Sequence, residues 1–174
     1  MTARILQLSV KARTPGEHGL PKRPVPALRV GASGAEGDYN KYRTRKLGGD
    51  PDQALLVLSD EVIQRLNAEG WPVRPGDLGE NLTLGAVAEA ELGPGVRLRA
   101  GEVVLELTGP CDPCTELHSL PYVGHAKGEA FVRTLLGRRG WYARVLAGGE
   151  LRPGDPMELT PGHPSARGTV TDVP

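Results

Sequence analysis

Glycine and proline interrupt this chain so often that they limit the length of any element it can form. The 174 residues include 24 glycines and 16 prolines, scattered without a repeating period. A collagen-like repeat is therefore excluded, and the pattern favours many short strands joined by turns. Because aromatic residues make up only 4% of the sequence, the core must be built from Leu, Val, Ile and Ala.

Apolar runs between these turns predict a mainly β fold. Arg4–Val10 has the pattern of a first strand, and the continuous apolar run Ala54–Leu58 is typical of a buried strand. Further short strands are expected at Ala27–Val30, Asn81–Leu84, Val96–Leu98, Val103–Thr108, Trp141–Leu146 and Met157–Leu159. Short strands at this turn spacing predict a closed or partly closed β-barrel.

Two or three helices are expected beside the barrel. Asp60–Glu69 has one apolar face, a capping residue before it and Gly70 after it, which predicts a helix. Ala130–Leu136 is expected to be a second helix. Lys11–Asp52 is rich in glycine, proline and charge and is predicted to be largely a loop, of a length that is often functional.

Length and charge indicate how many domains the chain has and which partners it can bind. Residues 1–160 are predicted to form a single domain and residues 161–174, rich in Pro, Gly, Ser and Thr, a disordered tail. The 21 basic and 21 acidic residues cancel, so no nucleic-acid or membrane partner is expected. No apolar run reaches the ~20 residues of a membrane helix and no signal peptide is visible, which predicts a cytoplasmic protein.

The two cysteines share one loop after a predicted strand. Cys111 and Cys114 lie within Gly109–Thr115, directly behind Val103–Thr108. In a reducing compartment such a pair is more often reactive or metal-binding than a disulfide. A reactive cysteine acts as thiolate, which nearby cations favour. The alternative is a pair of small, half-buried apolar residues in a tight turn.

A zinc site is a competing interpretation of this loop. Cys111, Cys114, His118 and His125 are four donors of the types that tetrahedral zinc binds. Zinc ribbons, however, usually separate their two ligand pairs by a longer element. A thioredoxin-type redox pair is disfavoured because that motif normally opens a helix in a βαβ unit.

Other polar segments carry weaker signals. Gly76 and Gly79 allow sharp turns before Glu80 and Asn81, which either present polar groups to a ligand or only close a capped turn. Two groups of basic residues either form a phosphate pocket or lie on a solvated face. They are Lys41, Arg43, Arg45 and Lys46, and then Arg138, Arg139 and Arg144.

Several segments, taken in order, resemble a stand-alone MOSC domain, the family named after the C-terminal domain of molybdenum-cofactor sulfurase. The resemblance runs from about Arg4 to Leu159, and its specificity comes from the order and spacing of motifs that are weak one by one. The segments are Gly34–Asp38, Gly48–Ala54, Gly76–Leu82, Pro113–Cys114, and Gly140–Leu146 followed by Gly148, Gly149, Gly154 and Asp155.

The resemblance implies a fold and a site. It implies a barrel of the pyruvate-kinase type, and Cys114 as the thiol that carries sulfur or ligates molybdenum. It also implies that Gly79, Glu80 and Asn81 line the same pocket, with Asp38 from the first matching segment as a further cofactor-binding residue. The implied cofactor is the molybdenum cofactor (molybdopterin). Pyridoxal phosphate, used by the partner domain of the sulfurases, is not expected on this chain.

One position departs from the family pattern. Many members have an arginine three residues before the cysteine, whereas this chain has Cys111. Cys111 is therefore a second catalytic candidate, able to attack a persulfide on Cys114. Arg139 and Arg144 are the candidates for the phosphate end of the cofactor.

The expected function is therefore molybdenum-cofactor or sulfur chemistry. If the chain is an enzyme, the resemblance implies a sulfurtransferase-like protein or a molybdenum-dependent oxidoreductase, the latter including a reductase of N-hydroxylated compounds. The alternatives of another class are a non-catalytic sulfur carrier and a structural zinc-binding module. The expected partners are a small-molecule cofactor or substrate and a sulfur-donor or redox protein.

Overall fold

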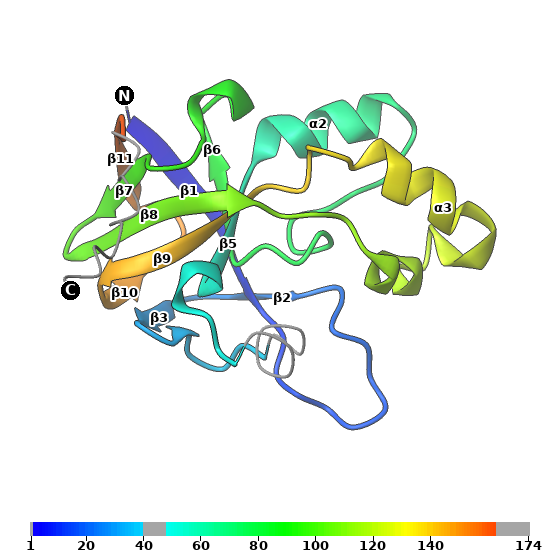
Figure 1. The fold of residues 1–174 in the computed structure, drawn as a ribbon, viewed down its shortest axis with the longest axis horizontal. Coiled ribbons are helices and arrows are strands. Elements are labelled where there is room, and N and C mark those ends of the chain that lie inside the picture. The colour runs from blue at the N-terminus through cyan, green and yellow to red at the C-terminus, as the bar shows by residue number, and fades with distance from the viewer. Residues whose placement is uncertain (1, 40–47, 163–174) are drawn as a thin grey trace, which may run out of the picture.

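Seven strands close into a barrel within residues 2–39 and 48–162, the parts of the chain that the computed structural model describes (Figure 1). The strands are β1 (Thr2–Val10), β5 (Leu55–Ser59), β6 (Leu82–Gly85), β7 (Arg97–Ala100), β8 (Val103–Pro110), β9 (Trp141–Ala147) and β11 (Pro156–Thr160). Their order is β11-β7-β8-β9-β5-β6-β1, and pairing between β11 and β1 closes the ring. Only β5 and β6 pair in parallel among these neighbours.

Several shorter strands and helices lie outside the barrel. The short strand β2 (Arg23–Val25) pairs with β1, and β3 (Leu28–Gly31), β4 (Gly34–Ala35) and β10 (Gly149–Leu151) form a separate sheet. The α-helices are α2 (Asp60–Ala68) and α3 (Gly124–Thr134), and the 3-10 helices are η1 (Pro51–Gln53), η2 (Glu89–Glu91) and η3 (Thr115–Ser119). Both α-helices lie at one end of the barrel (Figure 1).

Strand β5 separates two apolar cores. Val57 packs inside the barrel, while the next residue, Leu58, packs beneath the helices against a cluster that includes Leu66 and Phe131. Because successive side chains of a strand point to opposite faces, a strand buried on both faces must be apolar throughout. This explains the continuous apolar run that predicted a buried strand at Ala54–Leu58.

The predicted β-barrel with helices is confirmed, and two local predictions need correction. The second helix begins at Gly124 and ends at Thr134, rather than spanning Ala130–Leu136. Its first turns contain Gly124 and Gly128, which weaken the helical signal there. The predicted loop Lys11–Asp52 contains β2 and β4, which are too short to show a clear alternation, besides β3, which agrees with the short strand predicted at Ala27–Val30.

Some predictions fall outside the described residues. These concern Lys41, Arg43, Arg45 and Lys46, and the part of the predicted tail that covers residues 163–174. Among residues 2–39 and 48–162, no helix combines the length and apolar character that crossing a membrane requires.

Candidate functional site

Cys114 is presented by a loop with a rigid base. Its exposed side chain lies where the chain leaves β8 and enters η3. Pro110 pairs with Trp141, and the Cys111 amide donates to the Gly140 carbonyl at 2.9 Å. Gly140 has φ +85°, and a Cβ there would lie 2.4 Å from the Val57 carbonyl oxygen, so only glycine fits. The loop is therefore anchored at the junction of β8 and β9.

Arg139 connects this loop to the Gly76–Asn81 segment. Its side chain is buried, and its Nε donates to the Leu78 carbonyl oxygen at 3.1 Å. Nη1 donates to the Asp112 carbonyl oxygen at 2.9 Å and to Cys114 Sγ at 3.3 Å. Burial lowers the pKa of the guanidinium, but the nearby Cys111 and Cys114 sulfur atoms outweigh this and raise it above its ordinary value. A permanent positive charge therefore lies beside the exposed thiol.

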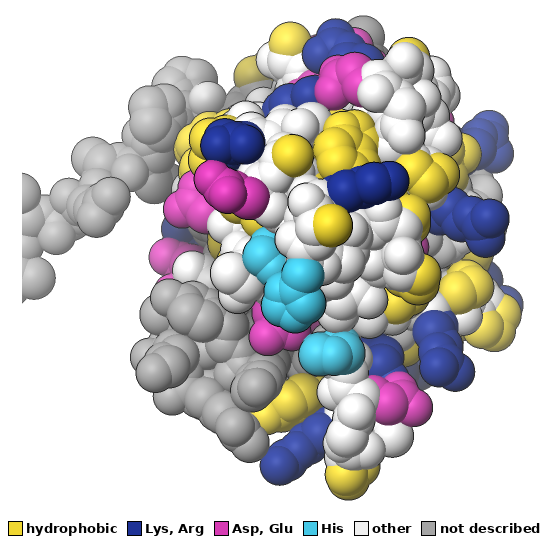
Figure 2. All heavy atoms as spheres, turned by 90° about the vertical axis from the view of Figure 1, so that its right-hand side faces the viewer, with side chains coloured by type: hydrophobic (Ala, Val, Ile, Leu, Met, Phe, Trp, Pro, Cys, Tyr) yellow, Lys and Arg dark blue, Asp and Glu magenta, His cyan; other side chains and the backbone are white. Residues whose placement is uncertain are grey.

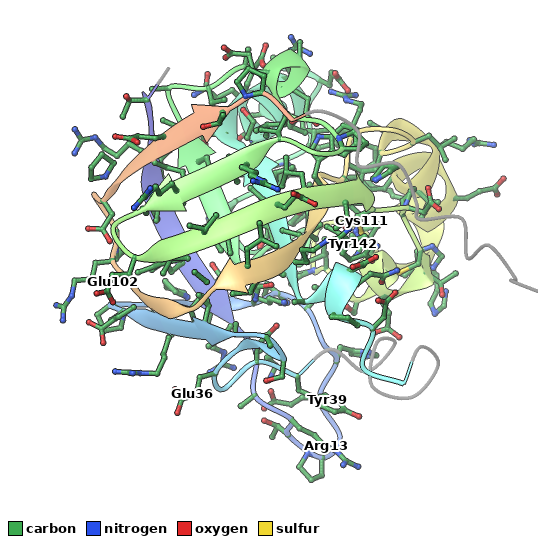
Figure 3. All side chains as sticks on the ribbon, turned by 60° about the vertical axis from the view of Figure 1, so that its left-hand side comes forward. Arg13, Glu36, Tyr39, Glu102, Cys111 and Tyr142 are labelled. Atoms are coloured by element: carbon green, nitrogen blue, oxygen red, sulfur yellow. The ribbon has the colours of Figure 1, made fainter. Side chains whose placement is uncertain are left out.

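The second thiol has different surroundings. Cys111 is buried, and its Sγ donates to Tyr142 Oη at 3.2 Å; Figure 3 shows the two side chains together. Burial raises the pKa of the Cys111 thiol, so Cys111 is protonated at neutral pH. Both cysteines are free. Cys114 is consequently the thiol that a ligand can reach.

The zinc site considered from the sequence is not formed. Within the described residues, no group of three or more His, Cys, Asp or Glu side chains could hold a metal ion. His118 instead lies against α3, where a Cβ at Gly128 would come within 2.5 Å of its ring, and it meets the His125 ring edge-on at 6.0 Å. Figure 2 shows histidine side chains on this helical end of the molecule. Packing against α3 accounts for His118.

Glu80 is turned into the protein interior. Its Oε1 accepts hydrogen bonds from the Gly76 amide at 2.6 Å and from Thr83 Oγ1 at 3.0 Å, whereas Oε2 is buried and has no hydrogen-bond partner among the residues that the structure describes. Burial, assisted by the nearby Asp77 carboxylate, raises the pKa of Glu80 to about 7. The carboxyl group therefore braces the turn that starts at Gly76.

Asn81 and Asp38 belong to one buried network. The Asn81 Oδ1 accepts from the Leu56 amide at 3.1 Å, and its Nδ2 donates to the Ser9 carbonyl oxygen at 3.1 Å and to Asp38 Oδ2 at 3.0 Å. The same Asp38 oxygen accepts from Lys22 Nζ at 2.7 Å. These bonds join the ends of β1, β5 and β6, and they engage the polar atoms that the sequence had offered to a cofactor.

Gly79 alone of the Gly-Glu-Asn segment faces Arg139. It has φ +93°, and a Cβ at this position would lie 3.7 Å from Arg139 Nη2 and 3.2 Å from Leu20 Cδ2. Gly79, Arg139 and Cys114 are therefore brought together.

Arg144 lies elsewhere on the barrel. Its Nε is 3.4 Å from Asp52 Oδ1 and 3.6 Å from Glu106 Oε1. Within residues 2–39 and 48–162 its ion-pair partners are these two carboxylates, and neither Cys114 nor Arg139 is among its partners. The assignment of Arg139 and Arg144 to the phosphate end of a cofactor stays a prediction, and in this arrangement Arg144 is engaged by Asp52 and Glu106.

A cavity with basic and acidic lining residues lies next to Leu20, and its Lys11 and Glu17 form an ion pair. It has a volume of about 290 Å³ and is lined by Lys11, Gly16, Glu17, His18, Leu20, Pro21 and Arg23. Leu20 links the cavity to Gly79, since its side chain contacts both. Sequence reasoning did not assign Lys11, His18 or Arg23. No sequence pattern distinguished these three residues. Lys11, which directly follows β1, stands out only in the structure, where it is buried.

A second cavity, of about 610 Å³, lies away from the predicted residues. It is bounded by the end of α2 and the start of α3, and Trp71, Tyr122 and Lys127 are among its lining residues. It contains none of the predicted site residues.

Comparison with known proteins identifies relatives. The family model described as the MOSC domain matches residues 44–158. YflK of Bacillus subtilis is 29% identical over 151 residues, covering 82% of this chain and 63% of that protein. YiiM of Escherichia coli is 30% identical over 132 residues, covering 72% and 56%. The chain thus spans less than two thirds of the length of these curated relatives.

Solved structures show the same fold. The YUAD protein from Bacillus subtilis superimposes with a TM-score of 0.74 at 22% identity, covering 91% of this chain and 96% of that chain. YiiM from Geobacillus stearothermophilus gives a TM-score of 0.64 at 27% identity, covering 91% and 75%.

Proposed function

Because the chain belongs to the MOSC domain family, we propose that it acts in molybdenum-cofactor and sulfur chemistry through the thiol of Cys114. The observation that carries the proposal is the exposed Cys114 sulfur beside the buried Arg139 guanidinium. Thiolate sulfur is a soft ligand, suited to molybdenum and to bound sulfur. Cys111 is buried against Tyr142, so it is less suited to be the first contact of a ligand.

The residues around Cys114 fit a molybdenum–pterin cofactor. Cys114 would supply the sulfur ligand, and Arg23 gives the adjoining cavity a guanidinium for a phosphate group, whereas Lys11 in the same cavity is paired with Glu17. When bound, the cofactor supplies a metal centre that exchanges electrons and oxygen or sulfur atoms. The chain's own residues hold Cys114 in place, through the Arg139 bonds to its sulfur and to the loop carbonyl of Asp112.

Metal and pterin content test this proposal directly. The full chain is produced in a host that makes the molybdenum cofactor, and molybdenum by elemental analysis and pterin by fluorescence are measured after purification. We expect both in the unsubstituted chain and at least about a tenfold loss of molybdenum in Cys114→Ser, because 1.4 kcal/mol of lost ligand affinity already weakens binding tenfold. Cys111→Ser, the matched control, should retain both. Protein free of molybdenum and pterin from such a host would contradict cofactor binding.

A sulfur-carrying role is the second candidate, favoured by the presence of a second thiol three residues from Cys114. In this role a donor protein forms a persulfide on Cys114. Cys111 then loses its proton to solvent and attacks Cys114 Sγ, a Cys111–Cys114 disulfide forms, and the terminal sulfur leaves as hydrosulfide. Cyanolysis of protein loaded with a persulfide donor should release sulfur from Cys111→Ser, where the persulfide cannot be resolved, and less from the unsubstituted chain, where part of the sulfur has left as hydrosulfide. Release from Cys114→Ser equal to that from Cys111→Ser would contradict this role.

A further inference from the structure

Arg139 is a buried cation without a carboxylate partner. Only 8% of its surface is exposed, and it forms no ion pair with any Asp or Glu in residues 2–39 and 48–162. The neighbouring Arg138 is different, since it holds Glu69 through two hydrogen bonds of 2.7 and 3.0 Å. Buried charges are usually paired, because removing them from water is costly. No carboxylate therefore neutralises Arg139 among the described residues, and the Cys114 sulfur is the anionic partner that the loop itself can offer, as thiolate.

The hydrogen bonds of Arg139 leave one end of the guanidinium available. Nε and Nη1 are engaged by the Leu78 and Asp112 carbonyl oxygens and by Cys114 Sγ. Nη2 makes no hydrogen bond with any residue that the structure describes. It lies close to Gly79: a Cβ there would be in van der Waals contact with Nη2, at 3.7 Å, and closer still to Leu20 Cδ2, at 3.2 Å, so glycine keeps this end of the guanidinium free of a covering side chain. The two N–H groups of Arg139 Nη2 are thus held near the exposed thiol.

We propose that Arg139 Nη2, Gly79 and Cys114 form a subsite for a small anion, such as a carboxylate or a sulfur oxyanion, held beside the Cys114 sulfur. A guanidinium donates strong, charge-assisted hydrogen bonds to such groups. The subsite selects anionic reaction partners for Cys114 and repels cationic ones. This proposal rests on the proposed function only in taking Cys114 as the reacting thiol. It assigns Arg139 to binding an anion next to the Cys114 sulfur, and not to binding the phosphate of a cofactor.

Alkylation with a matched pair of reagents tests the subsite. Iodoacetate carries a carboxylate and iodoacetamide is its neutral analogue; both transfer a carbon to sulfur with loss of iodide. The reaction is followed at Cys114 by mass spectrometry in a Cys111→Ser background, without any cofactor. The rate with iodoacetate is divided by the rate with iodoacetamide. This ratio is then divided by the same ratio for a neutral small thiol, N-acetylcysteine amide, in the same buffer. This normalised ratio removes differences in the intrinsic reactivity of the sulfur.

The subsite predicts a normalised ratio of about three to ten, since a local charge accelerates the approach of an anion by at least this factor. Arg139→Gln should lower it to about one, and Arg139→Lys should restore part of the preference. Arg138→Gln, the matched control, should leave it unchanged. Sodium sulfate should lower the ratio in a saturable manner, beyond the effect of sodium chloride at equal ionic strength.

Several outcomes would overturn the subsite. A normalised ratio near one in the parent protein does so, as does a ratio that Arg139→Gln leaves unchanged. If Arg139→Gln does not fold, Arg139→Lys and the sulfate competition decide, and equal effects of sulfate and chloride count against the subsite. Because no cofactor is present, a protein that fails to bind molybdenum can still show the preference, and one that binds molybdenum can lack it.

Discussion

The Cys114 loop and the network around Asn81 lie at the same end of the barrel, yet they treat polar groups in opposite ways. Around Asn81, each amide atom bonds to a strand end and the Asp38 carboxylate is neutralised by Lys22. Around Cys114, the thiol is exposed and no carboxylate in the described part of the chain neutralises the charge of Arg139. The contrast indicates that the first region holds the barrel together, whereas the second has bonding capacity left for a ligand.

The largest effect is expected from breaking the buried ion pair. Lys22→Met leaves the Asp38 carboxylate buried without its cation, since both side chains are 8% exposed. Removing one partner of such a pair costs about 3–5 kcal/mol of unfolding free energy. Urea unfolding followed by tryptophan fluorescence measures this. Lys127→Met, at an exposed position on α3, is the control and should change stability by less than about 0.5 kcal/mol. If Lys22→Met lowered stability as little as Lys127→Met, the network around Asn81 would not hold the barrel together.

A pH-dependent effect is expected at Glu80. Its pKa is raised from 4.5 to about 7 in the folded chain. Between these two pH values the folded state therefore binds more protons than the unfolded state, so the contribution of Glu80 to stability is full below pH 4.5 and is lost as the pH rises through 7. Relative to Glu80→Gln, which cannot ionise, the parent chain should lose about 3 kcal/mol across this range.

Urea unfolding at a series of pH values from 4.5 to 8 provides the measurement for Glu80. The difference between the parent chain and Glu80→Gln at each pH isolates this one carboxyl group, because other titrating groups are common to both. Stability curves that run parallel would show that Glu80 ionises as readily when folded as when unfolded. In that case Glu80 would resemble an exposed ligand residue and the contrast between the two regions would weaken.

The smallest effects are expected at the two cysteines. Cys114→Ser changes an exposed side chain and should alter the unfolding free energy by less than about 0.5 kcal/mol. Cys111→Ser places a more polar group in a buried site beside Tyr142 and should cost about 1 kcal/mol. Chemical denaturation of the two variants compares them. A larger loss of unfolding free energy for Cys114→Ser than for Cys111→Ser would show that Cys114 is a structural residue. The Cys114 loop would then not differ from the network around Asn81.

Local pattern was sufficient for the class of fold and for the loop that presents the exposed thiol. The run Ala54–Leu58 predicted a strand buried on both faces, and the capped, one-sided pattern after it predicted α2. The position of two cysteines behind a strand also predicted where a thiol would be presented. These features depend on residues close together in the chain, where backbone preference and apolar periodicity operate directly.

Only the tertiary structure decided which of the motif residues meet. Pairing of Pro110 with Trp141 places Arg139 beside Cys114, while Arg144, three residues further along β9 than Trp141, lies opposite Glu106 on the same pair of strands. Likewise Glu80 and Gly79 are neighbours in sequence, but one is turned inward and the other faces Arg139. Strand register and burial set these contacts, and both arise from interactions between distant segments that no local pattern encodes.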